Sequence, residues 1–471
     1  MKGHRRLTAL FLNMYFNIVT KLKKQRPHRP LAVGIFLIAL FVPAFSQKMD
    51  RVEKGRVHNM LMNVKKAIKN DYYDPNYGGM DLEARFKVAE EKLKATDNLG
   101  HAFAIIAQAV MDLNDSHTRF YPPATTSIVD YGWRIKVFGD KAFITAVDKD
   151  SDARKKGLTV GDEVLSINDF KLSRPELWKV LYYYESINPR ARLTMEVKSP
   201  KGEVRKLDMA ANVTTLKRKI DLEDTHDLNE AFREGDKLRN LNRHFFKEVG
   251  DAMIWKMPTF VFDPKEVGGL VGRANDKKTL ILDLRGNGGG YVVTLEKLAG
   301  YIFDKDLKIA DYKARKPRDP QQSKTEGSKV FKGKLIVLID GDSASASEIF
   351  ARLVQLEKRG VVLGDVSAGA VMMSQGVGFD AGVGDSSIAY GMNLTRADVI
   401  MSDGKSLEHT GVTPDELLIP TGDDLASLRD PVLARALELS GNPVDAAVAG
   451  KFFPPEPFIR RTSNLAFTWA R

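Results

Sequence analysis

The segment from Lys334 to Gly360 changes its hydrophobic pattern midway, and this change strongly constrains what the chain can fold into. It begins with five consecutive aliphatic residues, Leu335 to Ile339, flanked by glycine and aspartate. A short β-branched run with such flanks predicts a strand that is buried on both faces. From about Ser345 to Val354 the apolar residues recur at helical spacing. The segment therefore predicts a strand, a turn and a helix, the repeating unit of an α/β fold.

Three serines, Ser343, Ser345 and Ser347, occupy the predicted turn. A hydroxyl at such a turn lies beside backbone N–H groups that the helix leaves unpaired, and these groups can stabilise a developing oxyanion. The alternative is that the serines only cap the helix. This segment alone leaves both interpretations open.

A second strand-to-helix unit carries a glycine-rich turn. The apolar run Thr279–Leu284 leads into Arg285-Gly286-Asn287-Gly288-Gly289-Gly290, and a helical pattern follows. Glycines allow the backbone to approach a ligand closely and to turn its N–H groups inward. The turn lacks the Lys-Ser/Thr ending of a P-loop and the spacing of a dinucleotide-binding motif.

The ordered pair LILDLRGNGGG and SASASEIFA resembles the protease core of the tail-specific (C-terminal-processing) and tricorn-like serine peptidases. The resemblance implies an α/β (ClpP/crotonase-like) peptidase core with Ser345 as the nucleophile. It also implies that the backbone amides of Gly288, Gly289 and Ala346 form the oxyanion hole. We expect the core to span residues 251–440, with residues 421–440 forming a closing helix and 304–333 a loop-rich excursion.

A histidine follows the helical pattern of the N-terminal region (residues 48–127). The sequence Asp115-Ser116-His117-Thr118 could simply end a helix in a turn. In tricorn-like peptidases, which this region resembles, the corresponding histidine is the general base. The resemblance therefore assigns that role to His117 and places Ser116 in the same network. An imidazole base acts only when neutral, so we expect activity to fall in acid through an apparent pKa within a unit or two of 6.5.

One position departs from the Ser/Lys branch of these peptidases. Ala370 stands where that branch carries its base lysine, and no lysine occurs between Arg359 and Asp403. Further along, the segment from Asp403 to Asp415 resembles the G-x-x-x-E-x-x-G-V-x-P-D sequence of tricorn-like members. There a glutamate completes the catalytic tetrad, which implies this role for Glu408. The alternative is a surface carboxylate in a turn.

Residues 128–212 are predicted to form a small β-rich domain. The series S-x-A-x-x-x-G-L-x-x-G-D-x-V-L-x-I-N, from Ser151 to Asn168, resembles a PDZ domain. PDZ domains bind an extended C-terminal peptide as an added strand. A structural module whose groove is unused is the alternative. The charged residues 213–250 are predicted to be a linker, with a helix around Asp227–Glu248, and 441–471 to be a C-terminal tail.

The N-terminus explains most of the net charge of +11. Residues 1–46 hold eight Lys/Arg and no acidic residue, which leaves +3 for the rest of the chain, so the charge gives no reason to propose nucleic-acid binding. A basic lead, the apolar run Leu31–Phe45 and the small residues before Gln47 indicate a signal peptide, or an N-terminal anchor if it is not cleaved.

Together these features predict an exported, periplasmic or extracellular serine endopeptidase that acts on polypeptides without a metal or organic cofactor. Contact with a membrane is expected only through residues 1–46 if they are retained. An inactive PDZ/peptidase-like binding protein is the alternative, and the oligomeric state stays open.

Overall fold

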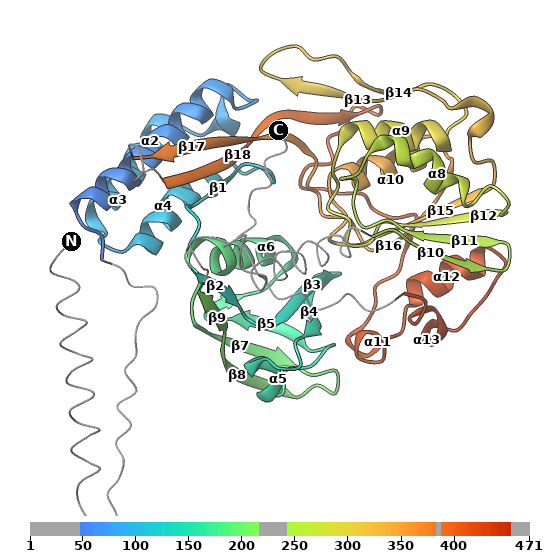
Figure 1. The fold of residues 1–471 in the computed structure, drawn as a ribbon, viewed down its shortest axis with the longest axis horizontal. Helices are drawn as coiled ribbons and strands as arrows, with labels where there is room; N and C mark the ends of the chain where they lie inside the picture. The colour runs from blue at the N-terminus through green and yellow to red at the C-terminus, as the bar shows by residue number, and fades with distance from the viewer. Residues whose placement is uncertain (1–47, 126, 216–242, 383–387, 454–471) are drawn as a thin grey trace, which may run out of the picture. The chain divides into compact units, whose positions relative to one another are not determined.

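The computed structural model describes residues 48–453 except 126, 216–242 and 383–387 (Figure 1). The predicted signal or anchor, most of the predicted linker and the end of the predicted tail lie outside these residues. Within the described residues, no helix is both long enough and apolar enough to cross a membrane.

Three helices form the N-terminal helical region: α2 (Arg51–Asp71), α3 (Leu82–Ala95) and α4 (Leu99–Met111). Each begins at a residue whose side chain accepts a hydrogen bond from the first turn, namely Asp50, Asp81 and Asn98. Their apolar faces pack into one cluster, and this explains the helical spacing in the sequence.

The core sheet has the strand order β10-β11-β12-β15-β16-β19 and is parallel except for β10. Its strands are β10 (Phe245–Val249), β11 (Ala252–Lys256), β12 (Thr279–Asp283), β15 (Lys334–Ile339), β16 (Gly360–Gly364) and β19 (Glu416–Leu417). Helices α8 (Val267–Gly272), α9 (Val292–Ile302) and α10 (Ala346–Leu356) cover one face, and α12 (Pro431–Leu439) and α13 (Ala446–Ala449) the other (Figure 1). Because both faces are covered, β12 and β15 are buried throughout almost their whole length, as their apolar runs predicted.

Two predictions about the core are wrong. Residues 304–333 are not a loop-rich excursion, because β13 (Leu307–Ala314) and β14 (Gln321–Ser323) pair there. β13 alternates buried and exposed residues at its start. Its exposed polar side chains interrupt the apolar run that would have predicted a strand. Residues 421–440 are not one helix but two, α11 (Gly422–Ala426) and α12, because Asp430 caps a new helix whose first residue is Pro431.

A second sheet joins the helical region to the core. It contains β1 (Arg119–Tyr121), β13, β14 and the long hairpin of β17 (Met372–Ala381) and β18 (Ile388–Met401). Figure 1 shows this hairpin running from the core to α2 and α3, and its far residues Ala381, Tyr390 and Met392 pack in the helical cluster. The hairpin thus fixes the helical region, and the turn that follows α4, against the core.

Residues 127–215 form a β-rich module with a six-stranded antiparallel sheet. Its elements are β3 (Trp133–Phe138), β4 (Lys141–Val147), α5 (Asp152–Lys155), β5 (Glu163–Ile167), β6 (Phe170–Lys171), α6 (Arg174–Tyr182), β7 (Arg192–Lys198) and β8 (Val204–Ala210), and β2 (Ser127–Asp130) pairs separately with β9 (Asn212–Thr215). β9 and β10 both lie in the segment predicted as a linker. Because β10 is a strand of the core sheet, the predicted helix cannot include residues 245–248.

The multidomain α/β architecture with N-terminal helices is as predicted from the sequence.

Candidate active site

Ser345 occupies a strained turn directly before α10. Its backbone angles are φ 56° and ψ −116°, a conformation that L-residues rarely adopt and that costs roughly 1–3 kcal/mol. Its N–H donates to the carbonyl of Ala370 at 2.9 Å and to Oε2 of Glu348 at 3.0 Å. These two contacts hold the turn in the strained geometry.

Ser343 and Ser347, the other two serines of the turn, have structural roles. Both are fully buried. The hydroxyl of Ser343 donates to the carbonyl of Leu284, and that of Ser347 donates to the carbonyl of Asn287. Their hydroxyls therefore connect α10 and its turn to the glycine-rich turn after β12.

The glycine-rich turn packs directly against Ser345. A Cβ atom added to Gly289 would lie 2.7 Å from Cβ of Ser345, and the φ of +94° at Gly289 also excludes most side chains. The N–H of Gly289 donates to Oδ1 of Asn287 at 2.9 Å. It is therefore not free to bind an oxyanion, contrary to the prediction from the sequence. In the part of the chain that the structure describes, the amides of Gly288 and Ala346 have no protein acceptor.

Ser116, His117 and Glu408 meet although 292 residues separate the serine from the glutamate. The hydroxyl of Ser116 donates to Oε2 of Glu408 at 2.8 Å and lies 2.7 Å from Nδ1 of His117. The hydroxyl proton of Ser116 points to the carboxylate, so the Ser116 oxygen can only accept from the imidazole. Nδ1 of His117 is therefore protonated and donates to Ser116. The lone pair of the imidazole is then on Nε2, where a general base needs it.

Two consecutive residues connect this network to the Ser345 turn. The carbonyl of Ala370 accepts from Ser345, and the N–H of Val371 donates to Oε2 of Glu408 at 2.9 Å. The position that carries a lysine in the Ser/Lys branch therefore contributes backbone contacts here. The Ser345 turn and the His117 network are therefore hydrogen-bonded to adjacent residues of the same loop, Ala370 and Val371.

Burial sets the charges of the network. Desolvation lowers the pKa of His117 to about 4, and the nearby Arg119 lowers it further while Asp115 opposes the shift. His117 is therefore neutral at neutral pH, as a general base must be. Burial raises the pKa of Glu408, whose side chain is 6% exposed, while hydrogen bonds from Ser116 and Val371 act against this rise.

Asp115 holds the turn that carries His117. Its Oδ1 accepts from the N–H groups of His117 and Thr118 and from the hydroxyl of Thr395 on β18, and its Oδ2 accepts from Tyr72. The sequence hinted at this role, since an aspartate at the start of a turn commonly accepts from the N–H two residues on.

Glu348 is a further residue of the site that the sequence did not lead us to predict. This carboxylate is fully buried in α10 and accepts four hydrogen bonds, from Ser345 N–H, Ser367 Oγ, Gly369 N–H and Ala370 N–H. Burial raises its pKa to about 7, while these hydrogen bonds oppose the shift. Its signal was the spacing Ser345-x-x-Glu348, which is that of a capping box.

We expect Glu348→Gln to lower kcat by roughly 10- to 100-fold, because one of the two paired acceptor oxygens becomes an NH₂ group that faces donors. The same substitution should lower the free energy of unfolding by about 1–3 kcal/mol. Steady-state kinetics and denaturant unfolding measure the two effects. Glu357→Gln is the control, since Glu357 follows the same helix but forms an ion pair with Lys305 instead of contacting the Ser345 turn. Equal kinetics in both variants would refute a role for Glu348 in holding Ser345.

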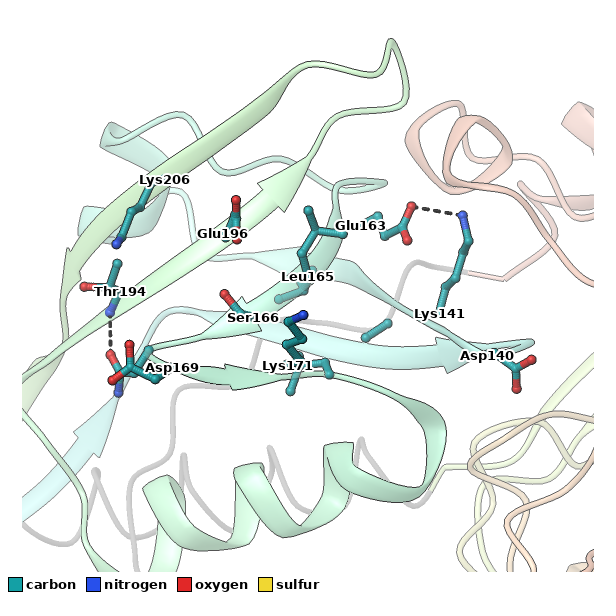
Figure 2. Close-up of a pocket in the computed structure, with 14 residues that line it drawn as sticks. Asp140, Lys141, Glu163, Leu165, Ser166, Asp169, Lys171, Thr194, Glu196 and Lys206 are labelled. Carbon is teal, nitrogen blue, oxygen red and sulfur yellow. Dashed lines mark hydrogen bonds and ion pairs between the residues drawn. The ribbon is translucent and has the colours of Figure 1, made fainter.

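A hollow of about 580 Å³ lies on the β-rich module, away from these residues (Figure 2). Figure 2 shows charged side chains of both signs along it, including the ion pair of Lys141 and Glu163. Its acidic residues are Asp140, Glu163, Asp169 and Glu196, and its basic residues are Lys141, Lys171 and Lys206. Ala142, Val164, Leu165 and Leu172 also line it, so the hollow is of mixed character. Among the described residues, no group of three or more His, Asp or Glu side chains is placed to hold a metal ion.

Comparison with known proteins agrees with the arrangement of the core. Residues 256–418 match the model of peptidase family S41. The tail-specific protease of Haemophilus influenzae is 25% identical over 79% of this chain, and the carboxy-terminal processing protease CtpB of Bacillus subtilis is 25% identical over 79%. This chain covers 53% of the first relative and 70% of the second, so it spans about half the length of the Haemophilus protein.

The fold has a solved counterpart in mature CPAF, crystallised with lactacystin. The two superpose with a TM-score of 0.60 at 16% identity, over 79% of this chain and 95% of CPAF. At this identity the likeness concerns the fold alone. Residues 256–418 thus match peptidase family S41, and the chain is similar to serine peptidases of the tail-specific and carboxy-terminal processing kind.

Proposed function

We propose that this chain is a serine endopeptidase in which Ser345 is the nucleophile and His117 the general base. The observation that supports this best is the double attachment of the 370–371 loop, to the Ser345 turn on one side and to the Ser116–Glu408 network on the other. Ser345 would attack the peptide carbonyl while Nε2 of His117 takes the hydroxyl proton and later gives it to the leaving amine. Ser116 and Glu408 would keep the imidazole in the required tautomer.

The tetrahedral oxyanion would bind to the amides of Gly288 and Ala346. One such donor can contribute about 3–4 kcal/mol to the stabilisation of the transition state. Gly289 contributes differently, by allowing its turn to approach Ser345 closely.

The competing function is a binding protein that has lost its chemistry. The strained backbone of Ser345 argues against it, since a strained residue persists where the surroundings over-determine it, commonly at an active site. Reaction with a fluorophosphonate probe followed by peptide mapping tests the two functions. An active peptidase should carry the probe on Ser345, whereas an inactive scaffold should carry none.

We also propose that the β-rich module is a PDZ domain that binds the C-terminal tails of substrates. The residues of the PDZ-like motif have structural roles: Ser151 caps α5, Ala153 and Leu158 are buried, and Asp162 pairs with Arg205. They support the fold more than a particular groove. β3 is an edge strand of the sheet, and an edge strand is where a peptide can be added.

The module contacts the core next to the proposed site. Arg174, the first residue of α6, pairs with Asp365 at 2.5 Å and donates to the carbonyl of Val366, and the N–H of Gly139 also donates to Asp365. Asp365 is buried and begins the loop that binds Glu348 and Ser345. Deleting the module would therefore expose a core carboxylate, so point substitutions are the better test.

We expect Arg174→Ala to lower kcat by at least about 10-fold even on short peptides, because Asp365 becomes a buried charge without its cation. Kinetics on a peptide too short to reach the module measure this. The control is Arg192→Ala, which breaks an exposed pair with Asp208 in the same module. If both variants cleave the short peptide at the wild-type rate, the junction does not support the active site.

Export is the proposal for localisation, and it rests on the basic and apolar pattern of residues 1–46. Cell fractionation with N-terminal sequencing of the recovered protein tests it. Retention of the whole chain in the cytoplasm would contradict it.

A further inference from the structure

Arg119 lies two residues after His117 and is the first residue of β1. In the extended segment 118–121 the side chains of Thr118 and Phe120 are buried, and those of Arg119 and Tyr121 are half-buried on the opposite side. His117 and Arg119 are close enough for the guanidinium to lower the pKa of the imidazole. A permanent cation therefore stands beside the proposed general base.

In the part of the chain that the structure describes, no carboxylate lies within 4 Å of the guanidinium of Arg119, and its Nε is buried without an acceptor. Its one described partner is the ring of Trp178 on α6, with Cζ 4.4 Å from the ring centroid. Stacking occupies the flat face of a guanidinium and leaves its N–H edge free to bind a carboxylate through two parallel hydrogen bonds.

The β-rich module fixes this arginine in place. Trp178 belongs to α6, and Tyr182 of the same helix donates its hydroxyl to the carbonyl of Phe120 in β1. Arg119 is thus oriented by contacts on both sides, so less side-chain entropy would be lost when it binds an anion.

We propose that Arg119 binds a carboxylate of the substrate on the C-terminal side of the cleaved bond. The side follows from His117, which gives its proton to the leaving amine and therefore lies beside the C-terminal fragment. Because Arg119 follows His117 by only two residues, we expect the bound anion to lie within a few residues of the cleaved bond. The α-carboxylate of a short tail and an Asp or Glu side chain supply the same chemistry.

This proposal rests on the proposed function, and a matched peptide set tests it. The peptides carry one to four residues after the cleaved bond, each as free acid and as C-terminal amide, with Asp or Asn at each position. We expect the wild type to favour the carboxylate by about 10- to 100-fold in kcat/KM, the range of a charge-assisted pair, and Arg119→Gln to reduce this ratio to about one. Arg119→Lys keeps the positive charge but loses the planar guanidinium that can make two parallel hydrogen bonds. It should therefore give an intermediate ratio of kcat/KM between the carboxylate and the neutral peptide.

Arg273→Gln is the control, because Arg273 stacks on Phe246 at the same 4.4 Å but lies just after α8, against β10 of the core sheet. Loss of preference on amidation would assign the α-carboxylate, and loss on Asp-to-Asn exchange would assign a side chain. No preference in the wild type, or a preference that survives Arg119→Gln, would overturn the proposal.

Binding of the same peptides to Ser345→Ala, followed by fluorescence anisotropy, separates this proposal from the proposed function. The ratio of Kd between the neutral and the carboxylate peptide, amide over acid or Asn over Asp, should exceed one in that variant and fall to about one when Arg119→Gln is added. If the ratio appears while the wild type cleaves nothing, the peptidase assignment fails and the carboxylate site stands. If neither variant shows the ratio although the wild type cleaves, the carboxylate site fails.

Discussion

Ser345→Ala should abolish peptide cleavage and fluorophosphonate labelling while the protein stays folded. The hydroxyl is the proposed nucleophile, so its removal leaves only whatever rate the rest of the site gives to water, and triad enzymes typically lose about six orders of magnitude in kcat. The fold should tolerate alanine, because the turn is held through the backbone N–H of Ser345 and not through its hydroxyl proton. Digestion of a peptide library read by mass spectrometry, together with a thermal unfolding curve, measures both outcomes.

Ser343→Ala and Ser347→Ala are the matched controls, since they lie in the same turn. Each removes a buried hydrogen bond to a backbone carbonyl, so each should lower the free energy of unfolding by about 1–3 kcal/mol and still permit cleavage. Wild-type cleavage by Ser345→Ala would show that the nucleophile lies elsewhere.

The strand-to-helix units of the core could be predicted because their signals are local. Buried parallel strands such as Thr279–Asp283 are continuous apolar runs, and α10 follows with helical spacing. β13 escaped prediction because one side of it is exposed, so polar residues interrupt the apolar ones. β14 escaped because its three residues, Gln321–Ser323, are all polar. The Asp430-Pro431 pair is itself typical of a helix start, an N-cap followed by proline, and so indicates the break before α12.

The site residues were predicted singly, and their assembly was not predictable from local patterns. Ser116 contacts Glu408 because the hairpin of β17 and β18 connects the helical region to the core. Hydrophobic periodicity in the sequence does not predict such a long-range contact. Glu348 was missed because its role depends on three donors from the 367–370 loop. The engagement of the Gly289 amide is equally a matter of tertiary geometry.

His117→Ala should lower kcat/KM by roughly 10²- to 10⁴-fold, the usual contribution of a general acid–base group. Nε2 of His117 holds the lone pair that would take the proton of Ser345, since Nδ1 is engaged with Ser116. His101→Ala is the control, because His101 is an exposed histidine of the same helical region. Near-normal activity in His117→Ala, with a lysine substitution elsewhere silencing the enzyme, would replace the histidine mechanism with a lysine one and leave Ser345 in place.

The pH profile gives the second, independent view of this base. His117 must be neutral to accept a proton, and burial lowers its pKa to about 4, so activity should persist down to that pH and be lost below it. Glu348 must be ionised to accept all four of its hydrogen bonds, and its pKa is raised to about 7, so a first, partial fall should occur as the pH drops through 7. Glu348→Gln separates the two groups, since it should remove the step near 7 and keep the step near 4. A single step near 6.5 that survives Glu348→Gln would mean that His117 titrates as a solvated imidazole, in which case its burial against Asp115 and Arg119 does not govern the base.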